Sequence, residues 1–293
     1  MRSLFLLLAL LLGSCCFPAL AADKAVISWG ADLTLSQKEQ VRQFFPDNDN
    51  AEEIVLTHQE ECRYLKGLVP DKVMGSLAIS SVYVEQLPKG EGIQVKTQNT
   101  NWVNGDMFRN VLATAGVTDA RVIAAAPVTV SGTAALAGMF KGFEAVTGKK
   151  LDQEAKEAAA DEMVTTGNLA AGLGDKDKAA ELVSLVKEKV AADNLASPEE
   201  IKQAVEEAAA EINVKLTKEQ IDSLIDLMKK FSNLDIDFQE LKTQVKSIND
   251  KLNQALADHQ EMKGWLQKIM QFLEQSFHKL VDLIQPYLAS DKK

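Results

Sequence analysis

The glycines of this chain are confined almost entirely to its first part. Of the 16 glycines in the 293 residues, 15 lie at or before Gly174, and the following 119 residues contain only Gly264. Glycine and proline mark loops and strand ends, so their loss beyond about residue 150 to 175 predicts nearly continuous helix. We therefore expect an α+β chain: a small mixed sheet of about five strands with helices over residues 22–148, then all-α segments over 149–213 and 214–293, the last a long coiled-coil-like helix.

The first 21 residues predict a cleaved signal peptide. Met1–Ser3 gives a positive start, residues 4–12 are apolar, and Ala19 and Ala21 form a small-residue cleavage site. The apolar run is shorter than the roughly 20 residues that a membrane-spanning helix needs. We expect cleavage after Ala21 and a secreted, extracytoplasmic protein. The alternative is a lipobox ending at Cys15, which would anchor the chain as a lipoprotein.

Short apolar runs alternate with helical patterns over residues 22–148. Thr57 and Glu60 have the spacing of a capping box, which predicts the start of a helix. The loop 87–92, which holds one proline and two glycines, predicts a hairpin between two strands. The pattern predicts strands at 25–29, 53–56, 77–86, 93–98 and 121–126, and helices at 36–45, 58–66, 106–115 and 133–147.

The region after residue 149 contains strong helix-start signals. Helices are predicted at about 152–171 and 176–192. Ser197 with Glu200 forms a second capping box, and Pro198 occupies the first helical position between them. Thr217, with Gln220 three residues later, predicts another helix start.

A 3.5-residue apolar repeat runs through the C-terminal segment from Leu224. Only His259 and Ser276 interrupt it with polar side chains, and a repeat sustained this long predicts a coiled-coil seam against a partner helix. The positions are Leu224, Leu227, Phe231, Leu234, Phe238, Leu241, Val245, Ile248, Leu252, Ala255, His259, Met262, Leu266, Ile269, Leu273, Ser276, Leu280, Leu283 and Tyr287.

The apolar face of this segment widens near the C-terminus. Trp265, Phe272, Phe277 and Tyr287 extend it beyond a single seam, so the segment needs more than one packing partner. Burial against the chain's own helices, self-association, a protein partner and a membrane surface all remain open. A membrane surface is the weakest of these partners, because acidic and basic residues on the polar face offset each other.

Charge and motifs exclude several classes of function. The net charge is −10 and no basic block is present, which argues against nucleic acid as a partner. The chain lacks H-E-x-x-H, G-x-S-x-G and P-loop motifs, so no catalytic residues and no cofactor are predicted. His58 and Cys62 share a predicted helical face, but two ligands are too few for a metal site.

One segment is a candidate ligand site. Ser131, Gly132 and Thr133 follow a predicted strand and open a helix, whose free N–H groups favour an anion. The alternative is structural, with the two hydroxyls capping those N–H groups. If the predicted hairpin lies alongside, Ser80, Ser81 and Asn99 are possible neighbours of the site.

Two further features are interpreted as structural. Paired acids such as Glu60–Glu61 are typical of solvated helix faces, and no acid–base pair is evident. Cys62 would be the only cysteine left after cleavage at Ala21. We interpret Cys62 as a small, partly buried apolar residue, on the premise that no basic group stands where it would lower the pKa of the thiol.

Several segments together carry a family resemblance. The chain resembles the YpuA-like proteins, secreted bacterial proteins grouped as a domain of unknown function. The resemblance implies an exported bacterial protein and brings no reaction, cofactor or catalytic residue with it. It rests on Ser28–Leu33, Glu60–Leu65, Ile79–Val84, Gly92–Val95, Thr114–Gly116, Asp119–Ala120, Ser131–Leu136 and Leu216–Gln220.

Two functions follow as expectations. The first is a non-enzymatic, envelope-associated interaction protein that uses its C-terminal helix. The second is an extracytoplasmic ligand-binding or hydrolytic domain with its site at the Ser131–Thr133 helix start.

Overall fold

The computed structural model describes residues 24–234 except Lys66 and Leu68, and its contacts divide the chain into two units. The α/β unit comprises the described residues of Met1–Lys66, Asp71–Thr100 and Asp119–Lys150. The helical unit comprises those of Gly67–Pro70, Asn101–Thr118 and Leu151–Lys293. The predicted signal peptide, Cys15 and the repeat beyond Leu234 lie outside the described residues.

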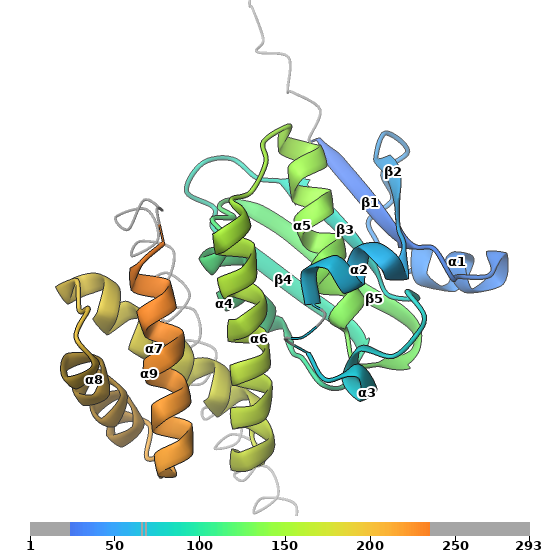
Figure 1. The fold of residues 1–293 in the computed structure, drawn as a ribbon. Coiled ribbons are helices and arrows are strands. Elements are labelled where there is room, and N and C mark those ends of the chain that lie inside the picture. Colours follow the sequence, from blue (N-terminus) through green and yellow to red (C-terminus); the bar gives the residue numbers. More distant parts are fainter. Residues whose placement is uncertain (1–23, 66, 68, 235–293) are drawn as a thin grey trace, which may run out of the picture. The chain divides into compact units, whose positions relative to one another are not determined.

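The α/β unit is built on a five-stranded mixed sheet in the order β2-β1-β3-β5-β4 (Figure 1). The two outer pairs, β1 with β2 and β4 with β5, are parallel, and the two inner pairs are antiparallel. This sheet, followed by an all-helical region, confirms the predicted fold class. The strands are β1 (Ala25–Gly30), β2 (Glu52–Leu56), β3 (Ser81–Gln86), β4 (Ile93–Thr100) and β5 (Ala120–Val130).

The predicted hairpin is wrong, because β5 lies between β3 and β4 and pairs with both. Residues 120–126 of β5 are mostly buried on both faces, which suits a central strand, whereas β4 is more polar and more exposed. The loop 87–92 does turn the chain, but Asp119 accepts hydrogen bonds from the N–H groups of Gly90 and Gly92. These bonds hold the loop against the start of β5.

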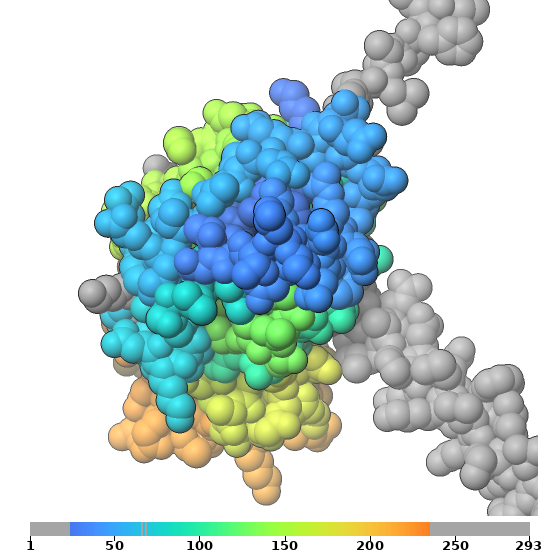
Figure 2. All heavy atoms as spheres, turned by 90° about the vertical axis from the view of Figure 1, so that its right-hand side faces the viewer, coloured from blue at the N-terminus to red at the C-terminus, as the bar shows by residue number. Residues whose placement is uncertain are grey.

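Helices cover both faces of this sheet. On one face, α5 (Thr133–Thr147) packs on β1 and β3, and Gly138 and Gly142 bring its backbone close to Val82 and Val84. Contacts join α2 (His58–Leu65) and the short α3 (Asp71–Met74) to α5. Residues from α1 (Leu35–Arg42) onward pack on the other face, against Trp29 and Tyr83. Figure 2 shows the side of the unit where the blue spheres of α1 lie.

The helical unit contains α4 (Gly105–Thr114), α6 (Gln153–Leu173), α7 (Lys176–Asp193), α8 (Pro198–Glu211) and α9 (Lys218–Ser232). The structure confirms the capping boxes that start α8 and α9. The first positions of the apolar repeat, Leu224, Leu227 and Phe231, are buried in this unit. No helix among the described residues is long and apolar enough to cross a membrane.

Candidate functional site

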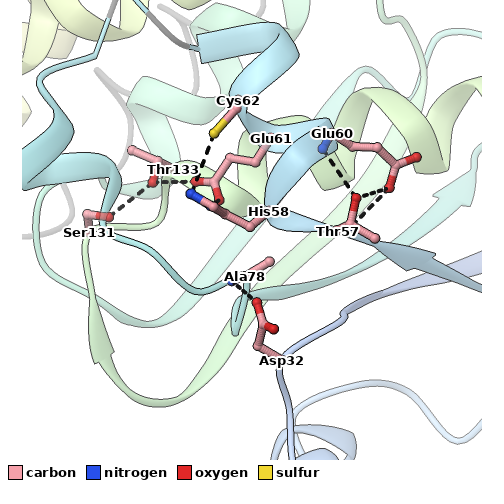
Figure 3. A network of polar contacts seen from close by, with 9 residues as sticks. All are labelled: Asp32, Thr57, His58, Glu60, Glu61, Cys62, Ala78, Ser131 and Thr133. Atoms are coloured by element: carbon pink, nitrogen blue, oxygen red, sulfur yellow. Dashed lines mark hydrogen bonds and ion pairs between the residues drawn. The ribbon is translucent and has the colours of Figure 1, made fainter.

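The carboxyl end of β1 is tied to the loop that precedes β3. The Asp32 carboxylate accepts a hydrogen bond from the Ala78 N–H at 2.7 Å, and the Asp32 N–H donates to the Ala78 carbonyl at 3.1 Å (Figure 3). Gly30 leaves no room for a Cβ, because that atom would collide with the Ala78 carbonyl. The backbone of loop 75–80 therefore lies directly against the strand end.

A cavity of about 260 Å³ lies beside this loop in the α/β unit. Its wall is mixed: one carboxylate, several hydroxyls and a set of apolar side chains. Ser80 is only 4% exposed and lies in this wall. The lining residues are Glu61, Val73, Met74, Gly75, Ser76, Leu77, Ile79, Ser80, Val130, Ser131, Thr133 and Ala134.

The carboxylate in the wall belongs to Glu61, whose side chain is fully buried (0% exposed). His58 Nδ1 lies 3.0 Å from Glu61 Oε2, and the Thr133 hydroxyl donates to Oε1 at 2.9 Å (Figure 3). The Ser131 and Thr133 hydroxyls are 3.2 Å apart. Burial raises the pKa of Glu61, and its contacts with His58 and Thr133 oppose that rise.

The other nitrogen of the same imidazole faces a thiol. His58 Nε2 lies 3.5 Å from the Sγ of Cys62, which is a free, partly exposed cysteine (Figure 3). Two interpretations of the sequence were therefore wrong: Glu61 is not on a solvated face, and Cys62 does have a basic group beside it. Both errors have the same cause. His58, Glu61 and Cys62 are spaced i, i+3 and i+4, so the α2 helix places their side chains next to one another.

The structure brings together three of the six residues proposed as a ligand site. Ser80, Ser131 and Thr133 line the cavity. The Ser81 hydroxyl instead accepts a hydrogen bond from the Gly30 N–H at 3.2 Å, and Asn99 donates to the Ala126 carbonyl at 2.8 Å at a β-bulge. Neither of those two lines the cavity.

Contrary to the structural alternative, the hydroxyls of Ser131 and Thr133 do not cap the start of α5. Gly132 is the N-cap residue, with φ of 98°, and no side chain caps the helix. The Ser131 and Thr133 hydroxyls contact each other, and the Thr133 hydroxyl donates to Glu61. Glu61 thus supplies a negative group beside the positive end of α5, within the chain itself.

Among the described residues, no group of three or more His, Cys, Asp or Glu side chains is placed to hold a metal ion. The other candidate surface, Trp265, Phe272, Phe277 and Tyr287, lies outside the described residues.

Comparison with known proteins extends over most of the chain. A family model described as "Protein of unknown function (DUF1002)" matches residues 29–248. The chain is 34% identical over 266 residues to "Uncharacterized protein YpuA" from Bacillus subtilis (strain 168), an alignment that covers 90% of this chain and 91% of that protein. No solved structure matches the chain. The family match spans the whole site, from Asp32 to Thr133.

Proposed function

The chain belongs to the DUF1002 family of proteins of unknown function, and we propose that it is an exported protein that binds a small cationic ligand in the cavity of its α/β unit. The observation that carries the proposal is the buried carboxylate of Glu61 in the cavity wall. The two oxygens of Glu61 contact His58 and Thr133, but a neutral imidazole and a hydroxyl leave the negative charge without a counter-charge, and a bound ammonium group would supply one.

The surroundings of Glu61 favour a cation over an anion. Among the described residues that line the cavity, Glu61 alone carries a formal charge, and the negative charge of Asp32 also acts on it. An anion at the start of α5 would meet these two carboxylates. The Ser80 hydroxyl adds a hydrogen-bonding group, and Met74, Ile79 and Val130 add an apolar wall.

The size of the cavity limits the ligand. At about 260 Å³ it lies just below the usual range for ligand pockets, about 300–1,000 Å³. A compact amine with a short apolar body suits this space and this wall. Serine-based hydrolysis is less well supported, because the Ser131 hydroxyl contacts Thr133 rather than an imidazole.

Thermal-shift and calorimetric titrations of the full chain test ligand binding. A panel of small primary amines should stabilise the protein, whereas carboxylates of the same size should not. Glu61→Gln and Ser80→Ala should each weaken the amine effect, and Glu60→Gln should not. Glu60 is a matched control, since it neighbours Glu61 on α2, pairs with Lys141 and does not line the cavity. Stabilisation by carboxylates, or amine binding unchanged in Glu61→Gln, would contradict the proposal.

Export rests on the first 21 residues of the sequence. Mass spectrometry of the protein made in a bacterial host should find a mature N-terminus at Ala22. An acylated Cys15 at the N-terminus would establish the lipoprotein alternative, and an intact Met1 would contradict export.

A second candidate function is association at the cell envelope through the C-terminal segment, without enzymatic activity. Its support is the repeat that starts in α9 and continues through Tyr287 in the sequence. Analytical ultracentrifugation should show a dimer or larger species for the full chain and a monomer for a chain ending at Leu234. A full chain that stays monomeric at high concentration would contradict self-association, while liposome flotation that is lost on truncation would favour a membrane surface.

A further inference from the structure

A thiol, an imidazole and a buried carboxylate follow one another on α2. Cys62 Sγ lies 3.5 Å from His58 Nε2, and His58 Nδ1 lies 3.0 Å from Glu61 Oε2 (Figure 3). The three differ in exposure: Glu61 is fully buried, His58 is 28% exposed, and Cys62 is partly exposed. A nucleophile within reach of a base, with the base oriented by a third group, is the general signature of an activated nucleophile.

The contacts of Glu61 define which nitrogen of His58 is basic. When the Glu61 carboxyl is ionised it can only accept, so His58 then carries its proton on Nδ1, and Thr133 donates to the other carboxylate oxygen. This tautomer leaves the lone pair of Nε2 facing the Cys62 thiol. Thr133 begins α5 and Glu61 lies on α2, so two helices fix the orientation of the ring.

We propose that Cys62 is a nucleophilic thiol that undergoes exchange with small-molecule disulfides. His58 Nε2 takes the thiol proton as the Cys62 sulfur attacks one sulfur of the disulfide. A new S–S bond forms, the original S–S bond breaks, and the leaving thiolate takes the proton back from His58. One disulfide and one thiol are consumed, and one mixed disulfide and one thiol are formed, so no other reactant is needed.

Two features of the site favour this substrate class. Thiol–disulfide exchange requires a thiolate and a proton donor for the leaving thiol, and the pair of Cys62 and His58 supplies both. Glu61, which contacts His58, also lines the neighbouring cavity, and Ser80 and Thr133 lie in the wall of that cavity. The inference goes beyond the proposed function, since exchange depends on His58, which does not line the cavity.

The test uses the reduced full chain with oxidised glutathione as the disulfide. Mass spectrometry of the peptide that contains Cys62 follows the mixed disulfide and separates it from Cys15 and Cys16. In the wild type, exchange should stay fast well below pH 8.5, about where a free cysteine titrates. His58→Gln should slow it about tenfold to a hundredfold at neutral pH, by the size of general-base effects, and should restore the pH profile of a free thiol.

A control variant separates proton transfer by His58 from the effect of any positive charge near Cys62. Arg63 neighbours Cys62 in the sequence and is exposed, so Arg63→Gln should leave the rate within about twofold, as an exposed charge is well screened. Circular dichroism checks that the variants fold. If His58→Gln fails to fold, the wild-type pH profile and Glu61→Gln, which should also slow exchange at neutral pH, decide the question. A wild-type profile like that of a free cysteine, or a folded His58→Gln variant with the wild-type rate, would overturn the proposal.

Discussion

Adjacent residues of the same type have opposite environments in α2. Glu60 accepts a hydrogen bond from the Thr57 hydroxyl and pairs with Lys141 near the surface. Partial burial raises the pKa of Glu60, but these contacts outweigh it, so the pKa lies below its ordinary value. Glu61 points the other way, into the cavity wall, where burial raises its pKa. The amino-acid type therefore says little about the charge state until the helix is placed on the sheet.

The raised pKa of Glu61 predicts a pH-dependent stability. Above its ordinary pKa of 4.5 the unfolded chain loses the proton that the folded chain still holds, so stability falls as pH rises from there through the folded pKa. Glu61→Gln removes this loss. Urea unfolding at a series of pH values should show that the stability of the variant rises relative to that of the wild type as the pH increases across this window. A difference that does not change with pH would contradict the assignment.

Lys187 is a second buried charge, at the centre of the helical unit. Its side chain is 0% exposed, and its amine contacts both oxygens of Glu162 at 3.1 and 3.2 Å and the Asn110 carbonyl at 2.8 Å. Burial lowers the pKa of Lys187, while the charge of Glu162 opposes that effect. The ammonium also lies 5.6 Å from the centroid of the Phe231 ring.

Removing only one of the two charged side chains, Lys187 or Glu162, should therefore lower the free energy of unfolding more than removing both. Lys187→Met leaves the Glu162 carboxylate buried and unpaired, which should lower the free energy of unfolding by about 3–5 kcal/mol. The double variant Lys187→Met with Glu162→Leu should recover at least half of that loss. Urea denaturation of the three proteins measures it, and additive losses would show that the two side chains are not coupled.

At the scale of elements, two glycines of α6 give a matched pair. A Cβ on Gly167 would collide with the Trp102 ring, whereas one on Gly172 would meet only the end of the Gln220 side chain, at 2.5 Å. A ring packed against the helix cannot move aside as cheaply as a flexible amide. The same substitution should therefore have opposite effects at the two positions.

Gly172→Ala should leave the stability unchanged or raise it by up to about 1 kcal/mol, the gain in helix propensity. Gly167→Ala should lower it by about 1–3 kcal/mol, as overpacking does. Thermal and urea unfolding of the two variants give the comparison. If both variants gain equally, Trp102 does not pack on α6 as described.

The elements differ in how far the sequence predicts them. Ser197 with Glu200 and Thr217 with Gln220 start α8 and α9 as predicted, because a capping box is a local interaction. Strand pairing is not local: the turn at 87–92 was recognised, but β5 has the more apolar sequence and takes the place between β3 and β4. The same limit applies to the site: the sequence indicates Ser131 and Thr133, but not the contact of Thr133 with Glu61.

At the scale of the whole molecule, the first positions of the apolar repeat have a different role from the one proposed for the later positions. Leu224, Leu227 and Phe231 are buried by helices of the helical unit, which accounts for the first positions of the repeat. The association proposed for residues 235–288 does not draw on these side chains. The helical unit should therefore stay stable without that segment.

A chain ending at Leu234 should unfold cooperatively, with a free energy of unfolding within about 1 kcal/mol of the full chain in a dilute, monomeric sample. Circular dichroism in urea measures this. A large loss would mean that the later repeat packs on the chain's own helices, which was the other interpretation of its apolar face.

The strand order also has a consequence for the time at which the chain can fold. β1 and β3 are available once residue 86 has been made, but β5, which pairs with both β3 and β4, ends at Val130. In the same way α4 belongs with helices that begin only at Gln153. Such long-range pairing makes folding slow. During synthesis, each unit therefore waits for residues that follow a segment of the other, and that delay suits the export proposed above, which requires a chain that is still unfolded.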